Sequence, residues 1–408
     1  MLVPRNIIYD MRFVPDWLHA SADADRKFRD GLAALTGGSS KIIPLGRART
    51  GIYLLVKSAA REGRRKIILS PYTIPDVINL VKFGGGVPVF VDFLPNSTNV
   101  DIDHLAELID SDTAGVMVTH YHVSQKDMAA IGDLCRQRGV ALFDDCAISI
   151  GASYNGCPIG SLTDGSVFSF SGFKVLNYYW GGALAVPPGK TADALEQEVL
   201  SWPRLSTRLY LPQIRKVALY AAVTGPALFP LVFRLRRRVI GPGKIVDIFP
   251  LSRVETVQLD DTIRSRPANV ALCEWVRKLE TVRSVIDHRR GIAAIYDRYF
   301  REINVSAETP ESIRQESAFV NYPIVVGEER RDTIYRAALS ANFDVGLSLY
   351  PNAHEMPSLS GTEGRTNRIS KLVRSIVTLP THTRATPEYS ERLAKFMSGL
   401  LTAGQGRG

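Results

Sequence analysis

The stretch that decides the fold runs Gly165-Ser-Val-Phe-Ser-Phe-Ser-Gly-Phe-Lys174-Val-Leu-Asn-Tyr-Tyr-Trp-Gly-Gly-Ala-Leu-Ala-Val186. Its two apolar runs, the first of which is Val167 to Phe170, predict two buried strands with Lys174 in the turn between them. Removing an amine from water lowers its pKa, so a lysine at the edge of a core can act as a nucleophile. The alternative is a solvated loop lysine, which is the commoner case because lysines are seldom fully buried.

The composition indicates a globular protein of about two domains. The chain has 408 residues, of which 45% are hydrophobic and 22% are charged, and it contains no low-complexity tract. A net charge of +9 favours anionic partners such as nucleotides, phosphates or acidic lipids, but no basic-aromatic module predicts nucleic-acid binding. The four cysteines form neither a CxxC pair nor a metal-ligand spacing, and the first 25 residues carry acids and prolines. We therefore expect a cytoplasmic protein without a signal peptide.

From residue 41 the sequence alternates between apolar runs and helical patterns, which predicts an α/β fold. The runs are continuous, as in the strands of a mostly parallel sheet that is covered on both faces. Ligands bind such sheets at the carboxyl ends of the strands. Thr73, His120, Asp145 and Lys174 lie at or just past predicted strand ends, so we expect them to converge on one site. We expect strands at 66–70, 87–92, 115–120 and 140–145, and helices at 49–57, 77–83, 102–109 and 128–137.

The remaining segments suggest how the chain is divided into domains. Residues 1–40 are poorly periodic and are expected to form an N-terminal arm. Residues 41–265 would form the large domain, and residues 266–408 a linking helix with a smaller C-terminal α/β domain. Within that last part we expect an amphipathic helix over 269–302, a strand over 318–326, and helices over 331–339 and 387–400.

An insertion near residues 205–250 interrupts the alternating pattern. Its stretch 217–233 carries no charged residue and has basic residues on both sides, including an arginine cluster that begins at Arg234. A glycine and two prolines argue against a transmembrane helix, so we expect a segment that is buried or lies at a subunit interface. The alternative is an apolar patch with basic flanks, residues 211–240, that contacts acidic lipid at the inner face of the membrane.

Three features of the expected large domain fit one cofactor. Residues 45–51 form a glycine-containing turn before a helix, where backbone N–H groups can face a phosphate. Asp144 and Asp145 end a buried strand, and such a carboxylate can hold a protonated ring nitrogen. Lys174 follows 29 residues after Asp145 and can supply an amine. A phosphate site, an acid and a lysine are the parts of a pyridoxal 5'-phosphate (PLP) site, whereas no GxGxxG motif predicts a dinucleotide site.

Several short motifs follow one another in a distinctive order. They are Gly46-Arg-Ala-Arg-Thr-Gly-Ile-Tyr53, Ser70-Pro-Tyr-Thr73, Pro88-Val-Phe-Val-Asp92, Thr119-His-Tyr121, Asp144-Asp-Cys-Ala147, Phe168-Ser-Phe170 with Lys174, Gly181-Gly182, Arg266-Pro-Ala-Asn269 and Ser375-Ile-Val-Thr-Leu-Pro-Thr-His382. In this order and spacing the sequence resembles the DegT/DnrJ/StrS family of PLP-dependent sugar aminotransferases. The resemblance covers residues 43–186 and resumes at residue 266. It implies the aspartate-aminotransferase-like fold (PLP fold type I).

The resemblance implies a role for each matching residue. Lys174 would form a Schiff base with PLP and carry the proton during catalysis, and Asp145 would bind the pyridinium nitrogen. Ser169 and the backbone N–H groups at the start of the helix predicted at 49–57 would bind the phosphate. The family also implies a homodimer. The residues implied to contact the cofactor are Ala48, Arg49, Thr50, Thr73, His120, Asp145, Ser169 and Lys174.

Some positions depart from the family pattern, and most of them surround the expected site. Since Lys174 and Asp145 are both present, the chemistry at the lysine is expected to be kept. The substrate pocket, in contrast, is expected to differ from that of the family. The departures are Ile74 for an aromatic residue, Ile148 for a Gln, Ile150 for a His, Val175 for an Asn, and Arg264 or Arg266 near the position of a further Asn.

The leading hypothesis is an aminotransferase that moves an amino group from an amino acid, expected to be glutamate, to a keto sugar carried on a nucleotide. It would serve polysaccharide or glycoconjugate biosynthesis, and two half-reactions predict ping-pong kinetics. One alternative is a PLP-dependent sugar dehydratase, in which the position of Lys174 is often a histidine. Another is a non-catalytic, membrane-associated scaffold or sensor with the same fold, suggested by the departures and by the stretch 217–233.

Overall fold

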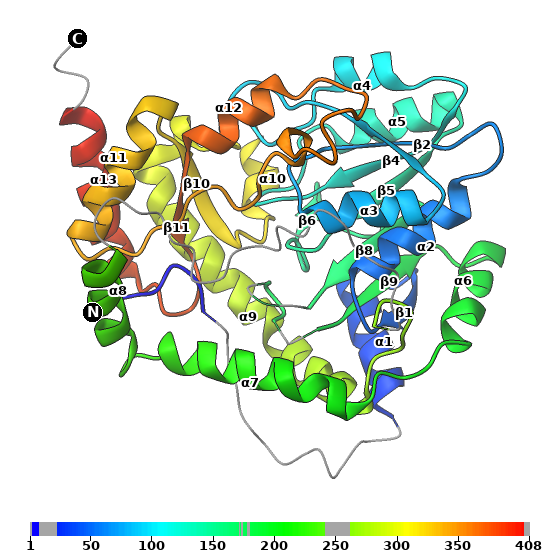
Figure 1. Cartoon of the computed structure of the whole chain (residues 1–408), viewed down its shortest axis with the longest axis horizontal. Helices are drawn as coiled ribbons and strands as arrows, with labels where there is room; N and C mark the ends of the chain where they lie inside the picture. The colour runs from blue at the N-terminus through cyan, green and yellow to red at the C-terminus, as the bar shows by residue number, and fades with distance from the viewer. Residues whose placement is uncertain are drawn as a thin grey trace.

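The computed structural model is built on a seven-stranded sheet (Figure 1). It describes residues 2–7, 23–170, 172, 174–177, 180–240 and 262–403. The strand order is β1-β9-β8-β5-β4-β2-β3, in which β9 runs antiparallel to both neighbours and the other pairs are parallel. The prediction of a mostly parallel α/β sheet is confirmed. The strands are β1 (Lys41–Leu45), β2 (Lys66–Leu69), β3 (Val87–Phe90), β4 (Thr113–Thr119), β5 (Ala141–Asp145), β8 (Gly165–Ser169) and β9 (Gly182–Val186).

Helices cover both faces of this sheet, because the strands send apolar side chains to both sides. In β2, for example, Ile67 and Ile68 are both fully buried, but they belong to different apolar cores. The core around Ile67 includes side chains of α2 (Arg49–Ala59), α3 (Pro75–Phe83) and α6 (Lys190–Leu200). The core around Ile68 includes side chains of α1 (Ala24–Leu35), α4 (Ile102–Leu108), α5 (Met128–Arg138) and α9 (Asn269–Phe300).

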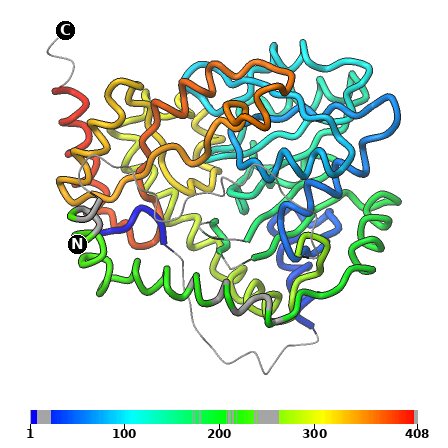
Figure 2. Tube along the Cα trace, viewed as in Figure 1, coloured from blue at the N-terminus to red at the C-terminus, as the bar shows by residue number. Residues whose placement is uncertain are grey.

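The C-terminal part of the chain packs around a third, smaller core. Its antiparallel strands are β10 (Asn321–Val325) and β11 (Ile376–Pro380), and the second half of α9 contributes to the same core. The N-terminal segment, blue in Figure 2, lies beside these orange and red elements: the Arg5 N–H donates to Asp344 at 3.0 Å. The helices of this part are α10 (Glu311–Gln315), α11 (Glu328–Ser340), α12 (Asn367–Ser375) and α13 (Pro387–Ala403).

The predicted strands and helices named above are confirmed to within a few residues at their ends. The sequence did not predict α1, which lies in the stretch where an arm was expected. Phe28 and Leu32 of α1 are fully buried, and the Phe28 ring lies 5.1 Å from that of Trp275 on α9. Residues 8–22 of the expected arm lie outside the described residues. A short hairpin of β6 (Ser153–Tyr154) and β7 (Cys157–Pro158) was also not predicted.

The insertion forms two helices: α7 (Thr207–Val223), along the lower edge of the view in Figure 1, and α8 (Phe229–Ile240), at its left side. The helices are separated at Gly225-Pro226, because proline cannot continue the hydrogen bonding of α7. Phe229 and Phe233 are buried, as expected for a core segment, whereas Leu231 is 65% exposed. Residues 241–250 of the expected insertion lie outside the described residues. In the part of the chain that the structure describes, no helix is long and apolar enough to cross a bilayer.

Candidate active site

Lys174 lies in the loop that joins β8 to β9, and the residues after it fix its position. Val175 and Leu176 are buried in the core beneath α9. The Asn177 side-chain oxygen accepts a hydrogen bond of 2.9 Å from the Lys278 amine of α9. Three consecutive anchored residues thus hold the point from which the half-buried Lys174 side chain extends.

The glycine pair before β9 brings the start of α2 close to the end of β8. Gly181 has a φ of 139°, and the Trp275 ring fills the space that a Cβ would need. At Gly182 a Cβ would overlap the backbone of Ala48 and the carbonyl oxygen of Phe168. Only glycine therefore permits this close approach between α2, β8 and β9.

The surroundings of Lys174 disfavour its charged form. Burial lowers the pKa of Lys174 to about 8; the Asp145 carboxylate partly offsets this, and the Arg49 guanidinium lowers the pKa further. The Lys174 Nζ donates a hydrogen bond of 3.2 Å to the Tyr350 hydroxyl. The neutral, nucleophilic form of the amine is therefore more populated near neutral pH at Lys174 than at an ordinary lysine.

Asp145 ends β5, which pairs directly with β8 in the sheet. Burial raises the pKa of Asp145, and the neighbouring Asp144 carboxylate adds to the increase. The Ala147 N–H, which donates to Asp145 at 3.0 Å, and the Lys174 amine act in the opposite direction. A buried carboxylate whose charge is disfavoured gains stability when a cationic group lies beside it, and a protonated ring nitrogen is such a group.

His120 follows β4 and is directed at Asp144 rather than at the carboxylate of Asp145. Its Nε2 lies 3.2 Å from Asp144 Oδ1, and the Gln125 N–H donates to its Nδ1 at 3.3 Å. Since Nδ1 accepts a hydrogen bond, the ring proton is assigned to Nε2, which donates to Asp144. Both side chains are fully buried, and the His120 N–H donates to the Asp145 carbonyl at 3.1 Å. The pair thus supports the strand end that carries Asp145.

The described residues include one group that is close enough to hold a metal ion. His120, Asp144 and Cys146 place their ligand atoms within 4.8 Å of one another. Burial raises the pKa of the Cys146 thiol well above its ordinary value, and the His120 Nε2 is already engaged with Asp144. Since a metal would require a thiolate and a free ring nitrogen, the chemistry of this group favours a hydrogen-bonded pair beside a buried thiol.

The start of α2 offers a site for an anion. Its N-cap residue, Ala48, has no side-chain acceptor for the N–H groups of the first turn, which together with the helix dipole attract negative charge. Ser169, the last residue of β8, is the register partner of Gly182, which contacts Ala48. Arg49 begins the helix and forms an ion pair with Asp76 of α3. The fold therefore brings Ala48, Arg49 and Ser169 to one place, as the sequence predicted.

Two other predicted residues have hydrogen-bond partners elsewhere. Thr50 is fully buried, and its hydroxyl donates to the Ile263 carbonyl at 2.7 Å, while its N–H donates to the Arg47 carbonyl at 3.3 Å. Thr73 is buried in the loop after β2, where its N–H donates to the Pro71 carbonyl at 2.8 Å. These contacts shape the backbone around the site.

Tyr350 is a residue of this site that the sequence analysis did not find. It lies in the C-terminal part of the chain, and its ring centroid is 5.6 Å from that of Tyr72 and 6.2 Å from that of Tyr121. Burial raises the pKa of Tyr350, and Asp145 adds to the increase, so its hydroxyl stays protonated. Because 176 residues separate it from Lys174, no local sequence pattern could have indicated the contact.

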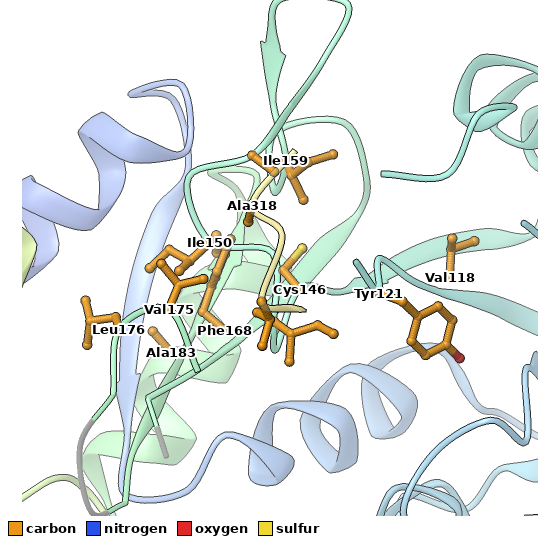
Figure 3. Close-up of a cluster of buried hydrophobic side chains, with 14 of the residues drawn as sticks. Val118, Tyr121, Cys146, Ile150, Ile159, Phe168, Val175, Leu176, Ala183 and Ala318 are labelled. Atoms are coloured by element: carbon orange, nitrogen blue, oxygen red, sulfur yellow. The ribbon is translucent and has the colours of Figure 1, made fainter. Parts of the chain in front are cut away.

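Three departures from the family pattern lie in one apolar cluster (Figure 3). Ile148, Ile150 and Val175 are at most 3% exposed and belong to one cluster. Figure 3 labels Ile150 and Val175 in this cluster, together with Phe168. At these three positions the resemblance implies a polar residue, and the fold places the three apolar side chains of this chain in a single core. Ile74 lies on the other side of the sheet, partly buried against the core that contains α2 and α3.

A comparison with known families identifies the family and the fold. The model of the DegT/DnrJ/EryC1/StrS aminotransferase family matches residues 14–200 and 270–398. The chain belongs to this family. The expected aspartate-aminotransferase-like fold is confirmed, and the family's aminotransferases are PLP-dependent. Helices α7 and α8 both lie in the interval that the family model leaves unmatched.

Individual relatives support the same family. GDP-perosamine synthase of Vibrio cholerae is 32% identical over 117 residues, which is 29% of this chain and 32% of that protein. The dTDP-4-dehydro-2,3,6-trideoxy-D-glucose 4-aminotransferase of Saccharopolyspora spinosa is 27% identical over 136 residues, which is 33% of this chain and 35% of that protein. The matched segments thus span about a third of the length of these relatives.

Solved structures share the whole fold. Helicobacter pylori PseC, an aminotransferase involved in the biosynthesis of pseudoaminic acid, has a TM-score of 0.72 at 15% identity, over 98% of this chain and 99% of its own. A chain of the same fold from Streptococcus pneumoniae, with a TM-score of 0.70 at 14% identity, is known in a PLP form and a PMP form. The similarity extends through the C-terminal part that carries Tyr350.

We expect Lys174 to react with an amine reagent at a lower pH than other lysines. Competitive acetylation with acetic anhydride, followed by mass spectrometry of peptides, should show half-maximal labelling of Lys174 near pH 8. Lys57 is the internal reference, because its hydrogen bond to Glu198 raises its pKa above 10.5. Equal labelling of both lysines across the whole pH range would contradict the assigned environment of Lys174.

Proposed function

We propose that this protein is a PLP-dependent aminotransferase that transfers an amino group from an amino acid to a keto sugar carried on a nucleotide. One observation carries the proposal: the half-buried Lys174 amine, with its pKa lowered to about 8, lies near the buried carboxylate of Asp145. Glutamate is the expected donor. The names of the relatives, a GDP-perosamine synthase and a dTDP-sugar aminotransferase, support a nucleotide-linked acceptor in polysaccharide or glycoconjugate biosynthesis.

The residues present fit PLP in their donor chemistry. Ala48, Arg49 and Ser169 would bind the phosphate through N–H groups, a guanidinium and a hydroxyl. The close approach of α2 to Gly182 keeps this phosphate site near the loop that carries Lys174. When bound, PLP supplies an electron-withdrawing ring that stabilises negative charge on the reacting carbon.

Each residue around Lys174 would then have a defined task. Lys174 Nζ would hold the cofactor, and after its displacement by the donor amine it would move the proton at the donor's α-carbon. A pKa of about 8 suits this task, because both forms of the amine are populated near neutral pH. Asp145 would keep the ring nitrogen protonated, and the Tyr350 hydroxyl would orient Nζ. The rings of Tyr72 and Tyr121, both buried, would exclude water from this side of the site.

Two measurements test the proposal. Purified protein should bind PLP with a change in its visible spectrum, and borohydride reduction followed by peptide mapping should find the cofactor on Lys174. A mixture whose spectrum equals the sum of the spectra of free PLP and the protein would contradict the proposal. In the second measurement, glutamate and a panel of nucleotide keto sugars should yield 2-oxoglutarate. Sugar turnover without 2-oxoglutarate would instead favour a dehydratase, and full cellular function of Lys174→Ala would favour a non-catalytic scaffold.

We further propose a cytoplasmic homodimer with the large domain at 41–265 and the small one at 266–408. Support for the location comes from four free cysteines, of which Cys135 and Cys146 are buried, since such thiols fit a reducing compartment. Support for the division comes from the separate apolar core around β10 and β11. Light scattering on the purified protein would measure the oligomeric state, and a monomer at all concentrations would contradict the dimer.

Tyr350→Phe is expected to lower kcat about tenfold, because it removes a hydrogen bond to a charged or reacting amine. The lost acceptor stabilised the ammonium form, so the pKa of Lys174 should fall below about 8. The acetylation curve and the pH profile of kcat/KM both measure this shift. Tyr299→Phe, which removes a hydroxyl bonded to Glu391 in the C-terminal part, is the matched control and should change neither.

A further inference from the structure

Helices α7 and α8 expose apolar side chains where a surface helix normally presents polar ones. Leu219, Leu231 and Leu235 are 66%, 65% and 58% exposed, the highest values among the large apolar side chains of the described residues. The inner side of α8 is already filled, because Phe229 and Phe233 are buried. The described residues thus leave these three leucines largely uncovered.

Basic residues share the exposed side of both helices with these leucines. On α7, Arg215 and Lys216 precede Leu219 by four and three positions, which places all three on one helix face. On α8, Arg234 and Arg238 are exposed and alternate with Leu231 and Leu235 at the same kind of spacing. We name this surface the α7–α8 face. Its members are Arg215, Lys216, Leu219, Leu228, Leu231, Arg234, Leu235 and Arg238.

The sequence around the α7–α8 face contains no acidic residue between Glu198 and Asp247, but nine lysines and arginines. The whole chain has 50 basic and 41 acidic residues, so removing these nine leaves 41 of each. The entire net charge of +9 therefore corresponds to this one segment, and the rest of the protein is balanced. This excess of basic residues favours a negatively charged partner.

Leucines beside arginines fit an acidic lipid surface better than a second copy of the chain. In a two-fold symmetric dimer the same patch meets itself, which would bring Arg234 and Arg238 of both copies together without acidic partners. At an anionic bilayer the leucines can enter the interface while the basic side chains reach the headgroups. The exposed leucines and the basic side chains of the α7–α8 face would then both contact the membrane.

We propose that the α7–α8 face docks the protein peripherally on a membrane that contains anionic phospholipid. The helices lie along the surface and do not cross it, in agreement with the absence of a spanning helix among the described residues. This docking is independent of the proposed transamination. It would hold the site near substrates or products that are handled at the membrane.

Vesicle sedimentation of the full-length protein tests the proposal. Phosphatidylcholine vesicles containing phosphatidylglycerol should bind the protein at low salt, and pure phosphatidylcholine vesicles should bind at least about tenfold less. Arg234→Glu with Arg238→Glu should cause a loss of similar size, because each basic residue near an acidic surface adds roughly a fivefold factor. Leu231→Ser with Leu235→Ser should also reduce binding, which a purely electrostatic contact would not show.

The control variant combines Arg138→Glu with Leu200→Ser, exposed residues of α5 and α6 outside the α7–α8 face, and should bind as the unaltered protein does. Circular dichroism and transaminase activity show whether each variant is folded. Absence of vesicle binding by the unaltered protein, or equal binding by all folded variants, overturns the proposal. A third outcome also overturns the proposal. If the unaltered protein is a dimer that does not bind vesicles, and Leu231→Ser with Leu235→Ser makes it a monomer, the α7–α8 face is a subunit interface.

Discussion

Lys174→Ala is expected to lower kcat/KM for transamination by at least about a thousandfold. The substitution removes the group that holds the cofactor and the group that moves the proton, and each loss alone costs a large factor. The fold should be unaffected. The folded-state pKa of about 8 lies below the ordinary 10.5, so the folded chain disfavours the charged amine at neutral pH. Removing the amine should therefore leave the melting temperature of the cofactor-free protein unchanged or higher.

Three measurements separate a chemical role from a structural one in this variant. Lys126→Ala, which removes a lysine paired with Glu308 at the surface, is the matched control and should keep full activity. PLP should remain on the unaltered protein after borohydride reduction and gel filtration, but not on Lys174→Ala. Added methylamine should restore part of the activity of Lys174→Ala, because a free amine can replace the missing one. Activity within tenfold of the unaltered protein would contradict the assignment.

The sequence predicted the parts of the fold in which local pattern and packing agree. Continuous apolar runs such as that in β5 identified strands covered on both sides, and the topology rule then placed Asp145 and Lys174 at one edge of the sheet. The sequence could not identify Tyr350, because the contact between Tyr350 and Lys174 depends on how the C-terminal part packs against the sheet. Helix α1 was missed for a related reason. Its buried residues Phe28 and Leu32 stand among charged residues in the sequence, and they are buried because α1 packs against α9.

Two details of the site also required the structure. The sequence located a helix start that could bind phosphate, but it could not show that Thr50 already bonds to Ile263 and Arg47. The replacements Ile148 and Ile150 looked like separate losses of polar residues along the chain. In three dimensions they share one buried cluster with Val175, so the three positions pack as parts of one core.

The insertion shows where a sequence rule gave an incomplete answer. A charge-free stretch is usually buried, and Phe229 and Phe233 follow that rule. The rule cannot show which side of each helix faces the protein, and the break at Gly225-Pro226 divides the stretch between two helices. Consequently Leu219 and Leu231 are exposed beside basic residues. The sequence offered an apolar patch with basic flanks at 211–240 as the alternative to a buried segment, but it could not show which side chains of the stretch are buried and which are exposed.

Asp145→Asn is expected to weaken PLP binding by roughly tenfold or more and to lower kcat by roughly a hundredfold. A neutral amide cannot hold a protonated ring nitrogen by a charge-assisted hydrogen bond, which contributes about 1.5–3 kcal/mol. The ring then loses its positive charge and withdraws electrons less strongly. Fluorescence titration with PLP and steady-state kinetics measure the two effects separately.

The same substitution should not destabilise the protein without cofactor. Because the folded-state pKa of Asp145 is raised, stability falls as pH rises from the ordinary value of 3.8 through the folded-state pKa. Above that range the buried charge is unfavourable, so Asp145→Asn should melt at the same or a higher temperature at neutral pH. A lower melting temperature together with unchanged PLP affinity would reverse the assignment and make Asp145 a structural residue.

Asp144→Asn is the matched control, since it makes the same chemical change at the adjacent residue. The amide oxygen can still accept from His120 Nε2, which lies 3.2 Å from Asp144 Oδ1, so the buried pair is kept. Removing the Asp144 charge lowers the pKa of Asp145, which favours the ionised form that a cationic ring requires. PLP affinity should therefore stay the same or increase. The opposite responses of two neighbouring carboxylates would identify Asp145, and not the general acidity of this strand end, as the partner of the ring.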